Sequence, residues 1–167
     1  MAEVGFQPRE DLVILRTEDW LINHRVDSAL PGYLIVGARM PANELAHLSP
    51  RALAELGNLL AKAQLALNGI LHPEHLYIGR YGHAAGHPIH FHIIPVCGWV
   101  KECFWSDTRY RVLQGLSGRS AVDETDGAEL TLFIWREFCE GRDPPAISGP
   151  SVDEVVERLK ISMAMPG

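Results

Sequence analysis

The stretch Gly86-His87-Pro88-Ile89-His90-Phe91-His92-Ile93-Ile94-Pro95 decides how this sequence is interpreted. The residue types at positions 89–95 predict a β-strand, in which successive side chains point to opposite faces of a sheet. His90 and His92 then share one face, and the apolar residues beside them share the other. We therefore expect a strand whose histidines border a site while its aliphatic side chains enter a core.

The remaining sequence predicts further strands and two helices. Apolar residues at spacings of three and four predict a helix from Pro50 to about Asn68, with Ser49 as N-cap and Asn68-Gly69 as its end. A capping box at residues 151–154 predicts a second helix that runs to about Lys160. Strand-like runs occupy residues 12–16, 20–23, 33–37, 76–80 and 129–135.

Composition limits the classes of protein that fit. The chain has 167 residues, of which 47% are hydrophobic and 22% charged, so we expect one domain over residues 1–167. It shows no membrane-length apolar run and no signal peptide, which predicts a cytoplasmic protein. A net charge of -6 without a basic cluster argues against a broad nucleic-acid surface. Cys97, Cys103 and Cys139 lack the spacing of a disulfide framework or a cysteine zinc site.

The paired histidines have three interpretations. They are hydrogen-bonded residues of a half-exposed strand, or they ligate zinc or iron together with His83 and His87, or one of them attacks phosphorus. Residues 79–100 contain no Asp or Glu. Because a metal site of this kind normally includes a carboxylate, that absence favours an anionic ligand over a metal.

The loop before the strand has residues suited to phosphate. Small residues such as Gly82 and Gly86 let backbone N–H groups approach phosphate oxygens, and Arg80, His83 and His87 add positive charge. An imidazole that attacks phosphorus forms a phosphoramidate and divides one displacement into two steps. His90 is the candidate nucleophile.

At this point the sequence resembles the histidine-triad (HIT) superfamily, whose signature is His-φ-His-φ-His-φ-φ with φ apolar. Residues 90–95 match its second half, and the order of turn, strand, long helix, strand and glycine-rich loop is similar over about residues 20–95. The resemblance implies that His90 accepts the nucleotidyl group and that His92 contacts the phosphate. The first triad histidine corresponds to Pro88, which departs from the family.

Two arrangements follow from that departure: His87 takes the place of the missing histidine, or Pro88 occupies it without a side-chain replacement. In the family the backbone carbonyl of the first triad residue orients the nucleophile, and proline keeps its carbonyl. By the same resemblance, Arg80 stands where a ribose- or phosphate-contacting residue is expected, and His24 lies near the wall of the base pocket.

The resemblance implies an α+β fold, with a meander-like antiparallel sheet and one long helix packed on it, over a core of about residues 11–97. Residues 98–167 form a C-terminal extension with a strand and a helix, and residues 135–138 lie at the edge of the site or in a dimer contact. The implied protein is a homodimeric hydrolase of phosphoanhydride or phosphoramidate bonds in nucleotides, or a nucleotidyl transferase, that needs no metal or cofactor. The alternatives are a nucleotide-binding or interaction protein with little turnover, and a His-ligated metal-dependent hydrolase.

Overall fold

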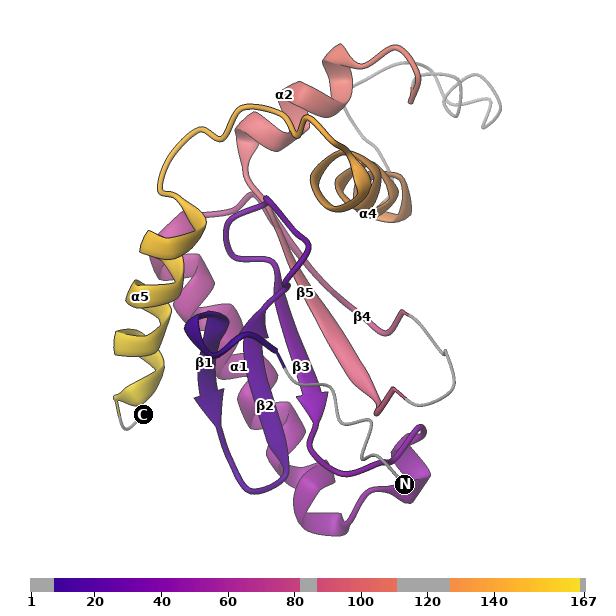
Figure 1. The fold of residues 1–167 in the computed structure, drawn as a ribbon, viewed down its shortest axis with the longest axis vertical. Coiled ribbons are helices and arrows are strands. Elements are labelled where there is room, and N and C mark those ends of the chain that lie inside the picture. The colour runs from indigo at the N-terminus through magenta and orange to yellow at the C-terminus, as the bar shows by residue number, and fades with distance from the viewer. Residues whose placement is uncertain (1–7, 82–86, 111–126, 166–167) are drawn as a thin grey trace.

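The histidine-bearing strand lies inside a five-stranded antiparallel sheet. The computed structural model describes residues 8–81, 87–110 and 127–165. The strands are β1 (Val13–Arg16), β2 (Trp20–His24), β3 (Leu34–Ala38), β4 (His75–Gly79) and β5 (His90–Val96), in the spatial order β1-β2-β3-β5-β4 (Figure 1). The α+β fold with an antiparallel sheet is confirmed, and so are these five strands. Two 3-10 turns, η1 (Glu10–Leu12) and η2 (Leu45–His47), precede β1 and α1.

The long helix α1 (Pro50–Leu71) begins where the sequence predicts and ends three residues later than expected. The Ser49 side chain caps its start by accepting a hydrogen bond from the Ala52 amide at 3.1 Å. The prediction that the helix ends at Asn68-Gly69 is wrong. Ile70 and Leu71 pack against the core, and this packing outweighs the low helix propensity of glycine. His72 ends the helix in the left-handed region, at φ 47°.

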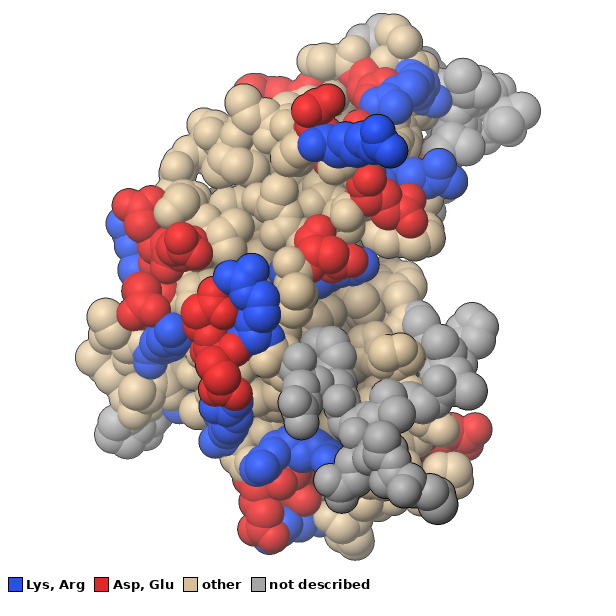
Figure 2. Space-filling view, viewed as in Figure 1, with Lys and Arg blue, Asp and Glu red and all other residues tan. Residues whose placement is uncertain are grey.

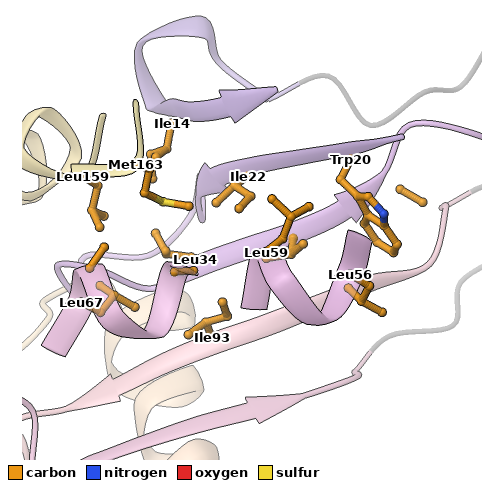
Figure 3. Packing of buried hydrophobic residues seen from close by; sticks show 14 of the residues in the cluster. Ile14, Trp20, Ile22, Leu34, Leu56, Leu59, Leu67, Ile93, Leu159 and Met163 are labelled. Carbon is orange, nitrogen blue, oxygen red and sulfur yellow. The ribbon is translucent and has the colours of Figure 1, made fainter. Parts of the chain in front are cut away.

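Helix α1 and the C-terminal helix α5 (Val152–Ala164) cover one face of the sheet (Figure 1). The predicted capping box is present, with the Ser151 side chain and the Glu154 side chain bonded to each other's backbone amides. Figure 3 shows the first core between these helices and the sheet, formed by residues that include Trp20, Ile22, Leu34, Leu56, Leu59, Leu67, Ile93, Leu159 and Met163.

The other face of the sheet carries a second core beneath α2 (Gly98–Ser106) and α4 (Gly127–Ile134). Strand β3 serves both cores, because Leu34 and Val36 enter the first whereas Ile35 enters the second. The second core is rich in aromatic residues, and its fully buried side chains include Val96, Phe104, Leu130, Phe133, Ile134 and Phe138.

The strand predicted at residues 129–135 is wrong, because this segment is helix α4, which continues into the π-helical segment η3 (Trp135–Glu140). Leu130, Phe133 and Ile134 are all buried in the second core. Their spacing of three and four places them on one side of a helix, whereas a strand would turn Phe133 away from the other two. The β-favouring composition of the run misled the prediction, and packing decides the conformation. Helix α2 was not predicted.

Two further observations complete the fold. The three cysteines are free and partly buried. Within the described ranges, no helix has both the length and the apolarity that a membrane crossing requires.

Candidate active site

The ring of His90 is oriented by the backbone of Pro88. Nδ1 of His90 lies 3.0 Å from the Pro88 carbonyl oxygen. A carbonyl only accepts hydrogen bonds, so Nδ1 carries the proton and Nε2 carries the lone pair. The Pro88 carbonyl is thus placed to orient the ring of His90, as the carbonyl of the first triad residue was expected to do. His87 lines the same cavity, so the two arrangements of the variant triad both stay predictions.

His92 sits beside His90 and is buried, with 7% of its surface exposed. Its ring centroid is 5.1 Å from that of His90 and 5.3 Å from that of Tyr81. Burial, together with the proximity of His90 and Arg25, lowers the pKa of His92 to about 4. His92 is therefore neutral at pH 7. Its Nε2 atom is buried and has no hydrogen-bond partner among the described residues.

Tyr33, the residue before β3, connects His92 to a charged pair. The Tyr33 hydroxyl lies 2.9 Å from Nδ1 of His92 and accepts a hydrogen bond from Arg25 Nη1 at 3.0 Å. Arg25 also donates to both carboxylate oxygens of Asp27, at 2.6 and 3.1 Å. The Arg25 guanidinium holds the pKa of Asp27 below its usual value, and burial raises the pKa of Tyr33 to about 12. The result is a buried neutral phenol between an ion pair and a neutral imidazole.

A cavity of about 840 Å³ opens beside the two histidines, between the sheet and helix α4. Apolar side chains contribute much of its lining, and Leu132 and Trp135 among them are 37% and 43% exposed. The lining comprises Arg25, Val26, Asp27, Tyr33, Ile35, Gly37, Tyr81, His87, Pro88, His90, His92, Ile94, Ala128, Thr131, Leu132 and Trp135. A cavity of this size accepts a drug-sized molecule.

Charge on the surface is mixed in sign. Figure 2 shows Lys and Arg side chains interleaved with Asp and Glu side chains on the face in view. Ion pairs among the described residues include that of Arg51 with Glu18 and Asp19, at 2.6 and 2.9 Å. On this face the described residues form no extended basic patch.

Comparison with known proteins rests on structure. No protein-family model matches the chain, and no curated protein matches it. A histidine triad protein from Bradyrhizobium japonicum is 18% identical with a TM-score of 0.55, over 90% of this chain and 89% of that one. A zinc-bound histidine triad family protein from Mycobacterium smegmatis is 14% identical with a TM-score of 0.52, over 92% and 84% of the two chains. This chain has the histidine-triad fold.

A larger structure shares that fold in part. A uridylyltransferase is 14% identical with a TM-score of 0.57, over 93% of this chain. The match covers 42% of that chain, so the uridylyltransferase is a much longer protein.

The histidine-triad fold brings three of the predicted site residues together. His87, His90 and His92 all line the cavity. Arg80 is exposed at the end of β4, does not line this cavity, and donates to the backbone carbonyl of Asn43. The predicted phosphate-binding residues Gly82, His83 and Gly86 lie outside the described residues.

His24 is not brought to the cavity. It is fully buried, and its ring nitrogens lie 2.9 Å from the backbone carbonyls of Arg25 and Leu30. Burial lowers the pKa of His24. A neutral imidazole has one N–H, so one of the two carbonyls accepts a hydrogen bond from His24, and this bond tethers the turn between β2 and β3.

A metal site was the competing interpretation. Among residues 8–81, 87–110 and 127–165, no group of three or more His, Cys, Asp or Glu side chains is placed to hold a metal ion. His83, which the metal interpretation also requires, lies outside the described residues.

Sequence reasoning missed Arg25, Tyr33 and Tyr81 as cavity residues. Strand β3 pairs with β5 so that Ile35 lies opposite His92, and Tyr33 shares the face of Ile35. Predicting that Tyr33 lies beside His92 therefore requires knowing that β3 pairs with β5. Trp135 was expected at the edge of the site, and it does line the cavity.

Proposed function

We propose that this protein is a nucleotide hydrolase or nucleotidyl transferase that acts on a nucleoside 5'-phosphoryl group through a covalent intermediate on His90. The observation that carries the proposal is the hydrogen bond between His90 Nδ1 and the Pro88 carbonyl. It leaves the Nε2 lone pair of His90 as the nucleophile, beside a neutral, buried His92 in a ligand-sized cavity. The fold shared with a uridylyltransferase and with histidine triad proteins supports the same reaction class.

The chemistry proceeds in two displacements. Nε2 of His90 forms a bond to phosphorus as the bond to the leaving group breaks, and the leaving group departs with the electron pair and takes up a proton. The ring then carries positive charge, which the Pro88 carbonyl stabilises through the Nδ1–H bond at 3.0 Å. Water, or a second phosphoryl acceptor, next attacks phosphorus and releases a proton to solvent, which balances the proton that solvent gave to the leaving group. The P–N bond breaks with its electron pair on Nε2, which returns His90 to its neutral form.

Helix α4 provides the apolar wall that would contact the rest of the substrate. Leu132 of α4 and Trp135, the first residue of η3, line the cavity and are partly exposed. A half-exposed indole offers a flat apolar surface for an aromatic group. We propose that this wall holds either the nucleobase or an apolar leaving group.

Adduct formation tests the proposal. The protein is incubated with nucleoside phosphoramidates and dinucleoside polyphosphates, quenched in alkali, and analysed by intact and peptide mass spectrometry. We expect a mass gain of one nucleoside monophosphate less water, located on His90, and its loss in His90→Ala. The control is His47→Ala, because His47 lies on the surface in η2 and does not line the cavity.

Each other outcome decides against part of the proposal. An adduct on another residue would remove His90 as the nucleophile. Nucleotide binding without adduct or turnover, unchanged in His90→Ala, would assign a binding protein instead. Stoichiometric metal that disappears on substitution of His90 or His92 would assign the metal-dependent hydrolase.

The subunit arrangement and location are also proposals. We propose a homodimer, as the resemblance to the histidine-triad superfamily implies, and, from the sequence patterns given above, a cytoplasmic location. Sedimentation equilibrium tests the dimer, and a mass equal to one chain across the concentration range would contradict it.

A further inference from the structure

We infer that Arg25 and Tyr33 are positioning residues that hold His92 as the neutral Nε2–H tautomer, so that His92 presents an N–H donor to the cavity. The inference rests on the proposed function only for the nature of the acceptor, a phosphoryl oxygen. Neither residue is needed as a nucleophile or a proton donor to the leaving group. Their role follows from the direction of the hydrogen bonds that connect them.

Arg25 sets the donor-to-acceptor direction of the hydrogen bonds that link Arg25, Tyr33 and His92. A guanidinium has only donors, so the 3.0 Å contact between Arg25 Nη1 and Tyr33 Oη places the hydrogen on the arginine. Arg25 is fixed in that position by Asp27, whose two carboxylate oxygens accept from Nε and Nη2. Tyr33 therefore already accepts one hydrogen bond from a cation.

The hydroxyl hydrogen of Tyr33 must then go to His92. Tyr33 is 2% exposed, and among the described residues its hydroxyl has two partners, Arg25 and His92 Nδ1. If His92 Nδ1 carried the proton, the Tyr33 oxygen would face two donors and its own buried hydrogen would lack an acceptor, which costs about 1–3 kcal/mol. Donation from Tyr33 to Nδ1 satisfies all three groups. The proton of neutral His92 then lies on Nε2.

The far side of the His92 ring agrees with this assignment. Nε2 is buried without a hydrogen-bond partner among the described residues, in a side chain that lines the cavity. The charged and titratable side chains around His92 are His90, Arg25, Asp27, Tyr33 and Tyr81. Burial, His90 and Arg25 lower the pKa of His92, and the Tyr81 backbone and Asp27 oppose them less strongly. A phosphoryl oxygen of a bound ligand would accept a hydrogen bond from this N–H.

A neutral donor has a chemical advantage at this position. His90 becomes positively charged when it attacks phosphorus, and its ring centroid lies only 5.1 Å from that of His92. A charged His92 would repel that developing charge. The Nε2–H of a neutral ring stabilises the phosphoryl oxygens without that repulsion.

The test is the protonation pattern of His92 in long-range ¹H–¹⁵N NMR spectra, since protonated and unprotonated ring nitrogens resonate far apart. At pH 7 we expect His92 with Nε2 protonated and Nδ1 unprotonated in the full-length protein. Tyr33→Phe removes the hydroxyl, so the preference for Nε2–H should be lost. Tyr110→Phe is the matched control, because Tyr110 is a buried tyrosine that bonds Glu137 at 2.9 Å and does not line the cavity.

If Tyr33→Phe folds poorly, the same NMR measurement is made on a second variant, Arg25→Met. Arg25→Met leaves Tyr33 free to accept a hydrogen bond from His92, so a mixture of tautomers is expected. A wild-type spectrum with Nδ1 protonated would overturn the inference without any substitution. An unchanged Nε2–H preference in Tyr33→Phe would overturn it as well.

Turnover gives an independent measurement. Tyr33→Phe should lower kcat about tenfold with a smaller change in KM, because the removal of a fixed donor acts mainly on the transition state. Equal kcat in Tyr33→Phe and Tyr110→Phe would overturn the role of the N–H donor. Failure of the proposed function is distinguishable, since it would leave the NMR result in place and show neither adduct nor turnover.

Discussion

Substitution at Pro88 tests whether its backbone carbonyl is sufficient to orient His90 without the side chain of a first triad histidine. Pro88→Ala keeps the carbonyl that lies 3.0 Å from His90 Nδ1. The substitution adds backbone freedom worth about 0.4–1 kcal/mol, which is at most about a fivefold change. We therefore expect kcat/KM within about fivefold of wild type, and the same for His87→Ala. His90→Ala should lose on the order of 10³-fold or more.

The hydrogen bond itself limits how large these effects can be. A net contribution of about 0.5–1.5 kcal/mol corresponds to roughly two- to tenfold in the population of the reactive tautomer. Burst-phase quenched-flow with a nucleoside phosphoramidate measures nucleotidylation of His90 directly in each variant. If Pro88→Ala were as slow as His90→Ala, or if His87→Ala abolished the burst, the carbonyl would not be the group that orients His90.

Three predictions concern the apolar wall, the second core and His92. Trp135→Ala should raise KM about tenfold in steady-state assays and change kcat less, because the indole contacts unreacted parts of the ligand; an unchanged KM would place the ligand elsewhere. Phe133→Ala should lower the free energy of unfolding in urea by about 3–5 kcal/mol, since Phe133 is 1% exposed among aromatic rings, and a loss below about 1 kcal/mol would contradict that burial. Because the pKa of His92 is about 4 when folded and 6.5 when unfolded, the unfolded chain takes up a proton first as pH falls. Between pH 7 and pH 5, the free energy of unfolding in urea should thus fall by up to about 2 kcal/mol more in wild type than in His92→Asn. An equal fall in the two proteins would refute the low pKa of His92.

The sequence predicted those parts of the site that lie on one element. The alternation in residues 89–95 placed His90 and His92 on one face of a strand, and β5 has that arrangement. Helix α1 was found from its apolar stripe and its Ser49 cap. In both cases the information is local, because the period of the element and the identity of its cap are contained within one segment.

The parts that join separate segments were beyond the sequence. Tyr33 meets His92 only because β3 pairs with β5 in one particular register, and Arg25 reaches Tyr33 only because the chain turns between β2 and β3. A one-residue shift in that register would place Tyr33 on the opposite face from His92. Register is set by packing on both faces of the sheet, so it could not be read from either strand alone.

Helix α4 shows why the fold and the site depend on each other here. Leu130, Phe133 and Ile134 enter the second core, whereas Leu132 and Trp135 line the cavity. A strand would alternate these residues and send Leu130, Leu132 and Ile134 to the same side. The helical period lets this short segment bury Leu130, Phe133 and Ile134 in the second core while Leu132 and Trp135 line the cavity. The aromatic core that fixes the helix therefore also fixes the wall of the candidate site, so a substitution that loosens the core should widen the cavity as well.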